Sequence, residues 1–412
     1  MSLLQPEPAM PKNKIPEPTE AINYVKRKLP VPTGKWDQLR MGEHVHAFTV
    51  AHSIGAAIVD DIFKIMAKSM EEGTGLGAFK RDMRRIMAEK GWYGRPDKTA
   101  KDKKYINRRL DTIYQTNILT AYSAGETRGM LRTAHLYPYW QYQQVQRNTK
   151  RQNHSAFHGL ILRYDDPFWA TGTPPNGWRC QCYRNQLSES QAKTLGGPTG
   201  IPQGVDMNSS IPKEWRYDPG REMIAPNFTR YDALKKIKYK GKSALSEIIA
   251  TYRKEMTGYQ LTQAEWNIYI SNLPDKSLPA KRLYADAPMM FSTLRTDAAE
   301  AIGEDVKLII KDRSVIHGAR IRRASDGSLA DVSLSINDMK NTPRKVADPE
   351  AIYKDNATGN LVFRYGVDKM HDIKAIFLPG RKLTSLMLHT FFKTRRGALD
   401  EDRRYSRIYI RK

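Results

Sequence analysis

The two cysteines of the chain lie two positions apart, in the segment PPNGWRCQC. Two histidines, His154 and His158, precede them in the segment HSAFHG. On a helix, histidines four positions apart would face one side, and on a strand, cysteines two positions apart would share one face. Two imidazoles and two thiolates are a ligand combination suited to tetrahedral zinc. The residues of this predicted structural zinc site are His154, His158, Cys180 and Cys182.

The same residues also allow an interpretation without metal. Cys-x-Cys is an unusual spacing for a zinc finger, and free cysteines often pack as small apolar side chains. In that case the thiols lie in a core and the histidines hydrogen-bond to nearby backbone. A disulfide between Cys180 and Cys182 is disfavoured because it would close a tight, strained ring. Spacing alone leaves both interpretations open.

A second group of residues suited to chemistry lies near the C-terminus, in LMLHTFFKTRRG. RNA cleavage without metal needs a base for the 2′-hydroxyl proton, an acid for the leaving oxygen and cations for the phosphate. His389 is the candidate general acid and base, with Thr390 as an orienting hydroxyl. Lys393 and Arg396 are candidate phosphate stabilisers, and His317 is the candidate second proton-transfer group. Without chemistry, these residues would form a basic β surface that binds DNA, RNA or the capsid.

Length and charge limit the class of protein. A chain of 412 residues exceeds one ordinary core, so we expect at least two domains. The 68 Lys and Arg against 44 Asp and Glu give a net charge of +24, which favours phosphate-rich partners. No window approaches the roughly 18 continuous apolar residues of a membrane span, and the start lacks a secretory signal pattern. We therefore expect a folded protein made in the cytoplasm.

Hydrophobic patterning divides the chain into four segments and predicts an α+β fold. The segments are an extended Pro-rich arm (1–45), a mainly helical region with a small β element (46–195), an irregular and helical connector (196–280) and a compact helix-plus-antiparallel-sheet domain (281–412).

Several elements of the second segment are expected in detail. Apolar residues recur at helical spacing up to Gly73, a second helix spans about residues 76–90, and a long helix ends before Pro138. The segment YWQYQQV then alternates like a strand. Trp169 and Trp178 are expected to fill core positions that fix irregular loops.

Residues 50–195 resemble a known phage family. A histidine with a glycine five residues later, then DDPFW, PPNGW and CxC, preceded by IYQTNILTAYSAGETRGM and PYWQYQQV, is similar to the phage Mu F-like head morphogenesis proteins. The resemblance implies a minor capsid protein that associates with portal and capsid proteins and travels with packaged DNA. It implies location in the host cytoplasm during assembly and then in the virion, at the capsid interior or portal vertex. It supports His154, Cys180 and Cys182 as metal or structural residues.

Residues 300–412 more diffusely resemble phage domains related to the barnase, EndoU, colicin and RelE nucleases. The order of a helix, VKLIIKD, NLVFRYG, IKAIFL and MLHTFF carries this resemblance. It implies metal-independent ribonuclease activity on host RNA, with an immunity protein as a partner. The favoured hypothesis is a phage or prophage minor head protein with a nuclease-like C-terminal domain. The alternatives are an RNase toxin delivered by the particle and a nucleic-acid-binding capsid protein without activity.

Overall fold

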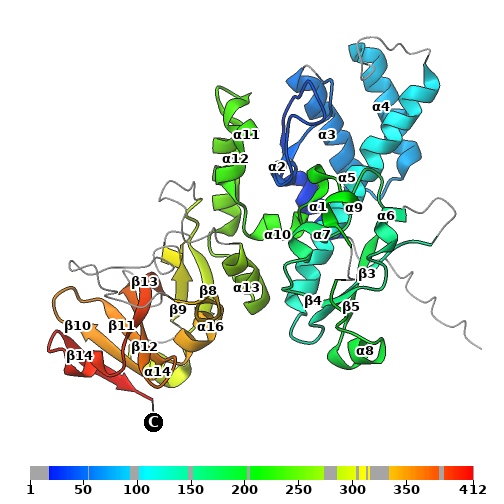
Figure 1. The fold of residues 1–412 in the computed structure, drawn as a ribbon. Helices are drawn as coiled ribbons and strands as arrows, with labels where there is room; N and C mark the ends of the chain where they lie inside the picture. Colours follow the sequence, from blue (N-terminus) through cyan, green and yellow to red (C-terminus); the bar gives the residue numbers. More distant parts are fainter. Residues whose placement is uncertain are drawn as a thin grey trace, which may run out of the picture.

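A computed structural model gives the fold of the chain (Figure 1). It describes residues 18–53, 55–92, 102–146, 152–201, 205–272, 285–302, 306–311, 314–315, 334–379 and 385–411. The fold is α+β, as the sequence predicts. We call residues 18–272 the first lobe and residues 285–411 the second lobe. No helix in the described ranges combines the length and apolar character needed to cross a bilayer.

Three long helices form the body of the first lobe, because each carries apolar residues at helical spacing. They are α3 (Ala56–Glu71), α4 (Leu76–Lys90) and α5 (Lys103–Arg132). Helix α4 ends at Gly91, whose φ of 64° is a left-handed conformation that glycine adopts without strain. Helix α5 begins after Asp102, whose side chain accepts a hydrogen bond from the Tyr105 N–H. The three predicted helices are confirmed.

A small antiparallel sheet packs beside α5. Its strand order is β4 (Ile161–Arg163), β3 (Tyr139–Gln143) and β5 (Tyr183–Leu187). Trp140 and Tyr142 alternate on β3 and are both fully buried. The connections hold the short helices α6 (Gln152–Ser155), α7 (Trp169–Gly172) and α8 (Glu189–Thr194).

Shorter elements complete the first lobe. They are α1 (Thr19–Lys26), β1 (Leu29–Pro30), α2 (Glu43–His46), β2 (Ala47–Phe48), α9 (Met207–Ser210), α10 (Pro219–Ile224), α11 (Asp232–Lys236), β6 (Lys238–Tyr239), β7 (Lys242–Ser243), α12 (Ala244–Met256) and α13 (Gln263–Ser271).

The predicted extended arm is partly folded. Residues 18–45 contain α1, whose apolar face is buried against α3 and α5, so the prediction of an extended segment is wrong there. Proline is compatible with the start of a helix as well as with an extended chain. Pro18 lies at the N-cap of α1. Residues 1–17 lie outside the described residues.

The second lobe is built on a seven-stranded sheet in which only β13 and β9 pair in parallel. The strand order is β14 (Tyr405–Ile410), β10 (Ala351–Asp355), β11 (Leu361–Gly366), β12 (His371–Pro379), β13 (Ser385–Arg395), β9 (Lys307–Ile310) and β8 (Met289–Thr293). Helix α16 (Ile336–Ala347) shares a core with one face, whereas α17 (Ala398–Glu401) packs Leu399 with Tyr353 and Val362 on the other. Helix α14 (Thr296–Glu300) follows β8.

Helix α13 joins the two lobes. Its Trp266 is fully buried and stacks on Phe291 of β8, with ring centroids 5.4 Å apart. The neighbouring Asn267 donates a hydrogen bond to the hydroxyl of Tyr164 in the first lobe, at 2.8 Å. One hydrophobic core therefore continues from the first lobe into the second. The boundary predicted between residues 280 and 281 lies outside the described residues.

Helix α16 was not expected, because Pro343 lies inside it. Proline has no N–H, so it cannot donate to the carbonyl of Met339 four residues earlier. The indole N–H of Trp266 donates to that carbonyl instead, at 2.8 Å. A contact from another helix thus supplies the hydrogen bond that the proline removes.

Candidate functional site

The small sheet anchors the two segments that carry the histidines and cysteines. His154 lies in α6, which precedes β4, and the cysteines immediately precede β5. Both strands pair with β3. The two cysteines lie in the loop between α7 and β5 (residues 173–182), which we call the cysteine loop. In this loop the Cys180 N–H donates to the Gly177 carbonyl at 3.1 Å, which forms a tight turn. Strand pairing therefore brings residues from distant parts of the sequence to one place.

His154, Cys180 and Cys182 form a compact cluster. The Nδ1 atom of His154 lies 3.6 Å from the Sγ atom of Cys180 and 3.6 Å from that of Cys182. Zinc bound tetrahedrally, about 2.3 Å from sulfur and about 2.0 Å from nitrogen, separates such atoms by roughly 3.6 Å. His154 is fully buried and Cys180 is 3% exposed. Within the described ranges, this is the one group of three or more metal-binding side chains.

The pKa of the Cys180 thiol lies below the usual value of a cysteine. A hydrogen bond from Cys182 lowers the pKa of Cys180 to about 4, with a further contribution from His154, although burial acts in the opposite direction. The thiolate is the form of cysteine that binds metal ions. The electrostatics of the cluster thus agree with its geometry.

His158 lies apart from this cluster. Helix α6 ends at Ser155, so His158 does not share a helical face with His154. His158 is exposed, and its Nδ1 atom accepts a hydrogen bond from the backbone N–H of Gln144, at 3.2 Å. The structure brings together three of the four predicted ligands.

Buried polar contacts tie the cysteine loop to β3 and α5. Asn176 in the loop accepts a hydrogen bond from the Tyr142 hydroxyl, at 2.8 Å. Arg184, two residues after Cys182, donates to the Thr127 hydroxyl of α5, also at 2.8 Å. The guanidinium of Arg184 lies 3.6 Å from the buried carboxylate of Asp218. The cluster therefore sits in a rigid frame.

The two tryptophans of this region differ in burial. Trp169 is fully buried against Trp140, with ring centroids 5.6 Å apart, as predicted. Trp178 is 43% exposed, so the prediction that it fills the core is wrong. It contacts Trp36 and Trp215 edge to face. The turn before Cys180, which composition does not reveal, places this ring at the surface.

Three of the C-terminal candidate residues, His389, Thr390 and Lys393, lie on β13. His389 is exposed and occupies the extra position of a β-bulge, between Leu388, which pairs with Phe377, and Thr390, which pairs with Ile376. Thr390 is buried. His317 lies outside the described residues, so its position relative to His389 is not described.

Lys393 and Arg396 both have protein partners. The Lys393 ammonium lies 2.7 Å from the carboxylate of Asp338 on α16. Arg396 donates to the carbonyl of Asp368, at 3.1 Å. Because side chains alternate along a strand, the structure places Lys393 and Thr390 on opposite faces of the sheet.

Residues 60–184 match the protein family described as Phage Mu protein F like protein. The chain carries a Mu F-like domain. The matched range runs from α3 into β5 and contains His154, Cys180 and Cys182, whereas every C-terminal candidate lies outside it. The predicted resemblance to the Mu F-like family is confirmed for this domain.

The Mu F-like similarity extends to two curated relatives. Over 185 residues the chain is 36% identical to the "Putative capsid assembly protein F" of Escherichia phage Mu, covering 43% of this chain and 42% of that protein. Over 371 residues it is 24% identical to the "Mu-like prophage FluMu F protein" of Haemophilus influenzae, covering 80% of this chain and 86% of that protein. The first match spans less than half of the relative's length. No solved structure matches the chain.

Proposed function

We propose that this protein is a minor capsid protein that acts in phage head assembly through its Mu F-like domain. The match of residues 60–184 to the Mu F-like family carries the proposal. The relative in phage Mu, which is named for capsid assembly, supports it. The partners are portal and capsid proteins. The protein acts in the host cytoplasm during assembly and then stays in the virion, at the capsid interior or the portal vertex.

The candidate metal centre has a structural role in this proposal. His154, Cys180 and Cys182 would hold one zinc ion. Bound zinc would link α6 to the loop before β5 and so stabilise the Mu F-like domain. The 3.6 Å separations between the imidazole nitrogen and both sulfurs favour zinc over two unrelated buried thiols.

Metal analysis tests the zinc centre. Protein purified from zinc-supplemented cells should contain one zinc per chain by mass spectrometry of the elements. The double variant Cys180→Ser with Cys182→Ser should contain none and should melt at a lower temperature. His158→Gln is the matched control, because it removes an imidazole of the same segment that lies outside the cluster. Wild-type protein without zinc would exclude the centre.

Complementation tests the assembly role. A phage or prophage lacking this gene should form few complete heads, and full-length protein supplied in trans should restore them and enter the particles. The double cysteine variant should restore fewer heads than His158→Gln, if the metal centre stabilises the assembly domain. Normal head yield without the gene would refute the assembly role.

A second candidate function is RNA cleavage by the second lobe. It rests on exposed His389 at the bulge of β13 and on the net charge of +24. Host RNA would then be a substrate, in addition to the packaged DNA that lies near the protein in the head. An immunity protein would protect the host. Full-length protein should cleave cellular RNA in EDTA, and His389→Ala should abolish cleavage. Arg403→Ala, an exposed basic control near the C-terminus, should remain active. Absence of cleavage by folded wild type removes this candidate.

A further inference from the structure

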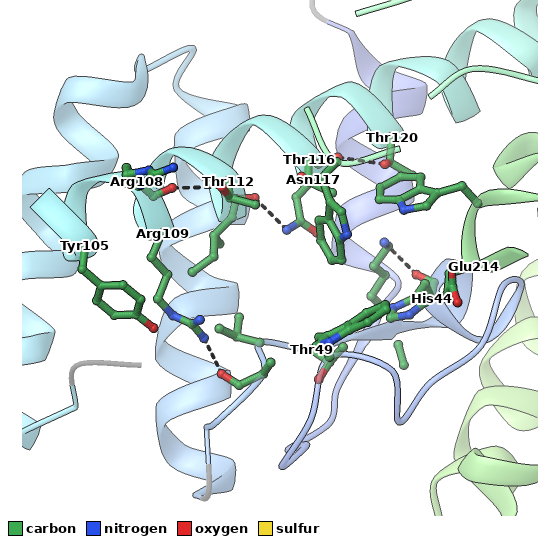
Figure 2. A pocket seen from close by; sticks show the side chains of 18 of the residues that line it. His44, Thr49, Tyr105, Arg108, Arg109, Thr112, Thr116, Asn117, Thr120 and Glu214 are labelled. Carbon is green, nitrogen blue, oxygen red and sulfur yellow. Dashed lines mark hydrogen bonds between the residues drawn. The ribbon is translucent and has the colours of Figure 1, made fainter. Parts of the chain in front are cut away.

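A large pocket opens beside α5, and Trp178, which precedes Cys180 by two residues, forms part of its lining. Its volume is about 890 Å³. Figure 2 shows polar side chains of α5 along one side of the pocket and residues from the N-terminal segment and the α9 to α10 connection on the other. The labelled residues on α5 include Thr112, Thr116, Asn117 and Thr120, and those opposite are His44, Thr49 and Glu214. Neither the family match nor the proposed assembly role assigns a ligand to this space.

Aromatic rings form part of the pocket wall. Trp36 is 49% exposed and Trp178 is 43% exposed, with ring centroids 6.2 Å apart in an edge-to-face contact. The buried Trp215 also lines the pocket and contacts Trp178 edge to face, with ring centroids 5.2 Å apart. Two half-exposed tryptophans next to each other leave apolar ring surface in water, which is unfavourable unless a partner covers it. Their flat faces suit planar groups.

The charges around the pocket favour an anion. The basic residues that line it are Lys28, Lys104, Arg108 and Arg109, and the acidic ones are Asp102 and Glu214. The carboxylate of Asp102 already caps α5, which partly neutralises it. Lys104 and Arg108 are exposed at the same end of α5. A ligand with phosphate or carboxylate groups would therefore be attracted to this end.

A polar atom on α5 also lacks a partner. The hydroxyl of Thr116 is buried and makes no hydrogen bond within the described part of the chain. Thr112 and Thr120 satisfy their hydroxyls on the carbonyls of Arg108 and Thr116. An occupant with hydrogen-bonding groups would satisfy the Thr116 hydroxyl, because buried polar groups are normally paired.

We propose that this pocket binds single-stranded DNA. Bases stack on Trp36 and Trp178, and phosphates lie near Lys104 and Arg108. Aromatic platforms beside basic side chains are the usual means of binding single strands without sequence preference, since every base has a flat π face. An acidic peptide would use the cations and leave the indoles uncovered. The inference depends neither on the zinc centre nor on the assembly role.

Fluorescence anisotropy of the full-length protein tests the site. The probes are a labelled oligothymidylate of eight residues, the same strand with abasic residues, octaglutamate and free thymidine monophosphate. The oligothymidylate should bind on the order of tenfold more tightly than the abasic strand, because only the former can stack. The double variant Trp36→Ala with Trp178→Ala should reduce this difference to nearly none.

Charge variants and matched controls complete the test. Lys104→Gln with Arg108→Gln should weaken both strands and reduce the dependence of log affinity on log salt by about 1.4, as expected for two phosphate contacts of a single strand. Tyr137→Ala and Arg85→Gln, which change exposed side chains outside the pocket, should bind like wild type. Thermal melting confirms that each variant is folded.

Three results would overturn the proposal. The first is equal affinity for the two strands, which would leave only non-specific attraction to a basic protein. The second is tighter binding of octaglutamate, which would point to an acidic peptide. The third is binding of the free nucleotide as tight as that of the strand, which would indicate a mononucleotide pocket.

Discussion

At the scale of single residues, burial determines the charge of His46. The side chain is 4% exposed, and a nitrogen of Arg27 lies 3.4 Å from its Nδ1 atom. Because a guanidinium only donates hydrogen bonds, Nδ1 must accept, and the imidazole is neutral. Burial, followed by the charges of Arg27 and Lys28, holds the pKa of His46 well below its usual value. In the same helix, burial and Lys28 lower the pKa of His44 to about 4.

We expect the protein to lose stability as the pH falls from 6.5 towards 4. In this window the unfolded chain protonates both histidines while the folded chain keeps them neutral, so the unfolded state binds more protons. Each such group lowers the free energy of unfolding by at most about 1.4 kcal/mol per pH unit. His46→Gln, whose amide oxygen can still accept from Arg27, should flatten the fall in melting temperature.

The control for this prediction is His135→Gln, which replaces an exposed histidine and should leave the slope unchanged. If His46→Gln and wild type lost melting temperature equally over this pH window, burial of a neutral His46 would not be the cause.

Residue types and spacing pointed to His154, Cys180 and Cys182, which the structure brings together, but they left open whether these residues bind metal or pack as buried thiols. They could not separate His154 from His158. That choice depends on where α6 ends, and the end of a four-residue helix is set by the packing around it.

At the scale of elements, α16 depends on a contact from α13. Pro343 leaves the Met339 carbonyl without its helical donor, and the Trp266 indole supplies one at 2.8 Å. The hydroxyl of Ser292 on β8 also donates to the Pro343 carbonyl, at 2.8 Å. Tertiary hydrogen bonds therefore compensate for a residue that disfavours the helix interior.

A double-mutant cycle tests this compensation. Trp266→Phe keeps an aromatic ring but leaves the Met339 carbonyl unsatisfied, which should cost about 1–3 kcal/mol of unfolding free energy. With Pro343→Ala in place, the new backbone N–H can satisfy that carbonyl, so Trp266→Phe should cost about 1 kcal/mol less. Urea denaturation of the four proteins gives the coupling. Additive costs would show that the indole hydrogen bond contributes nothing to α16.

Local patterns predicted the elements that depend on local sequence. The helix expected at about residues 76–90 is α4, and the alternating run YWQYQ forms β3. Local patterns failed where distant contacts decide the structure. Helix α16 is the example, since only the position of Trp266 makes a helix through Pro343 favourable. The register shift at His389 is equally invisible in sequence, because it arises from pairing with β12.

At the scale of the whole molecule, one hydrophobic core extends across both lobes. Although 412 residues would allow independent cores, buried side chains form a continuous cluster from Val31 in the first lobe to Phe391 in the second. An ion pair between Asp165 and Lys340, with 3.8 Å between the charged atoms, adds a contact from the Mu F-like domain to α16. The second lobe is therefore coupled to the Mu F-like domain and is not an independent domain on a flexible linker.

This coupling predicts a single cooperative unfolding transition of the full-length protein in differential scanning calorimetry. Trp266 is the central side chain of the junction, because it is fully buried and contacts both Phe291 and Met339. Trp266→Ala should remove about 3–5 kcal/mol of packing and separate the transition into two, one for each lobe. Trp36→Ala, which changes a half-exposed ring far from this junction in the sequence, should keep one transition. Two well-separated transitions in the wild type would show that the shared core does not couple the lobes.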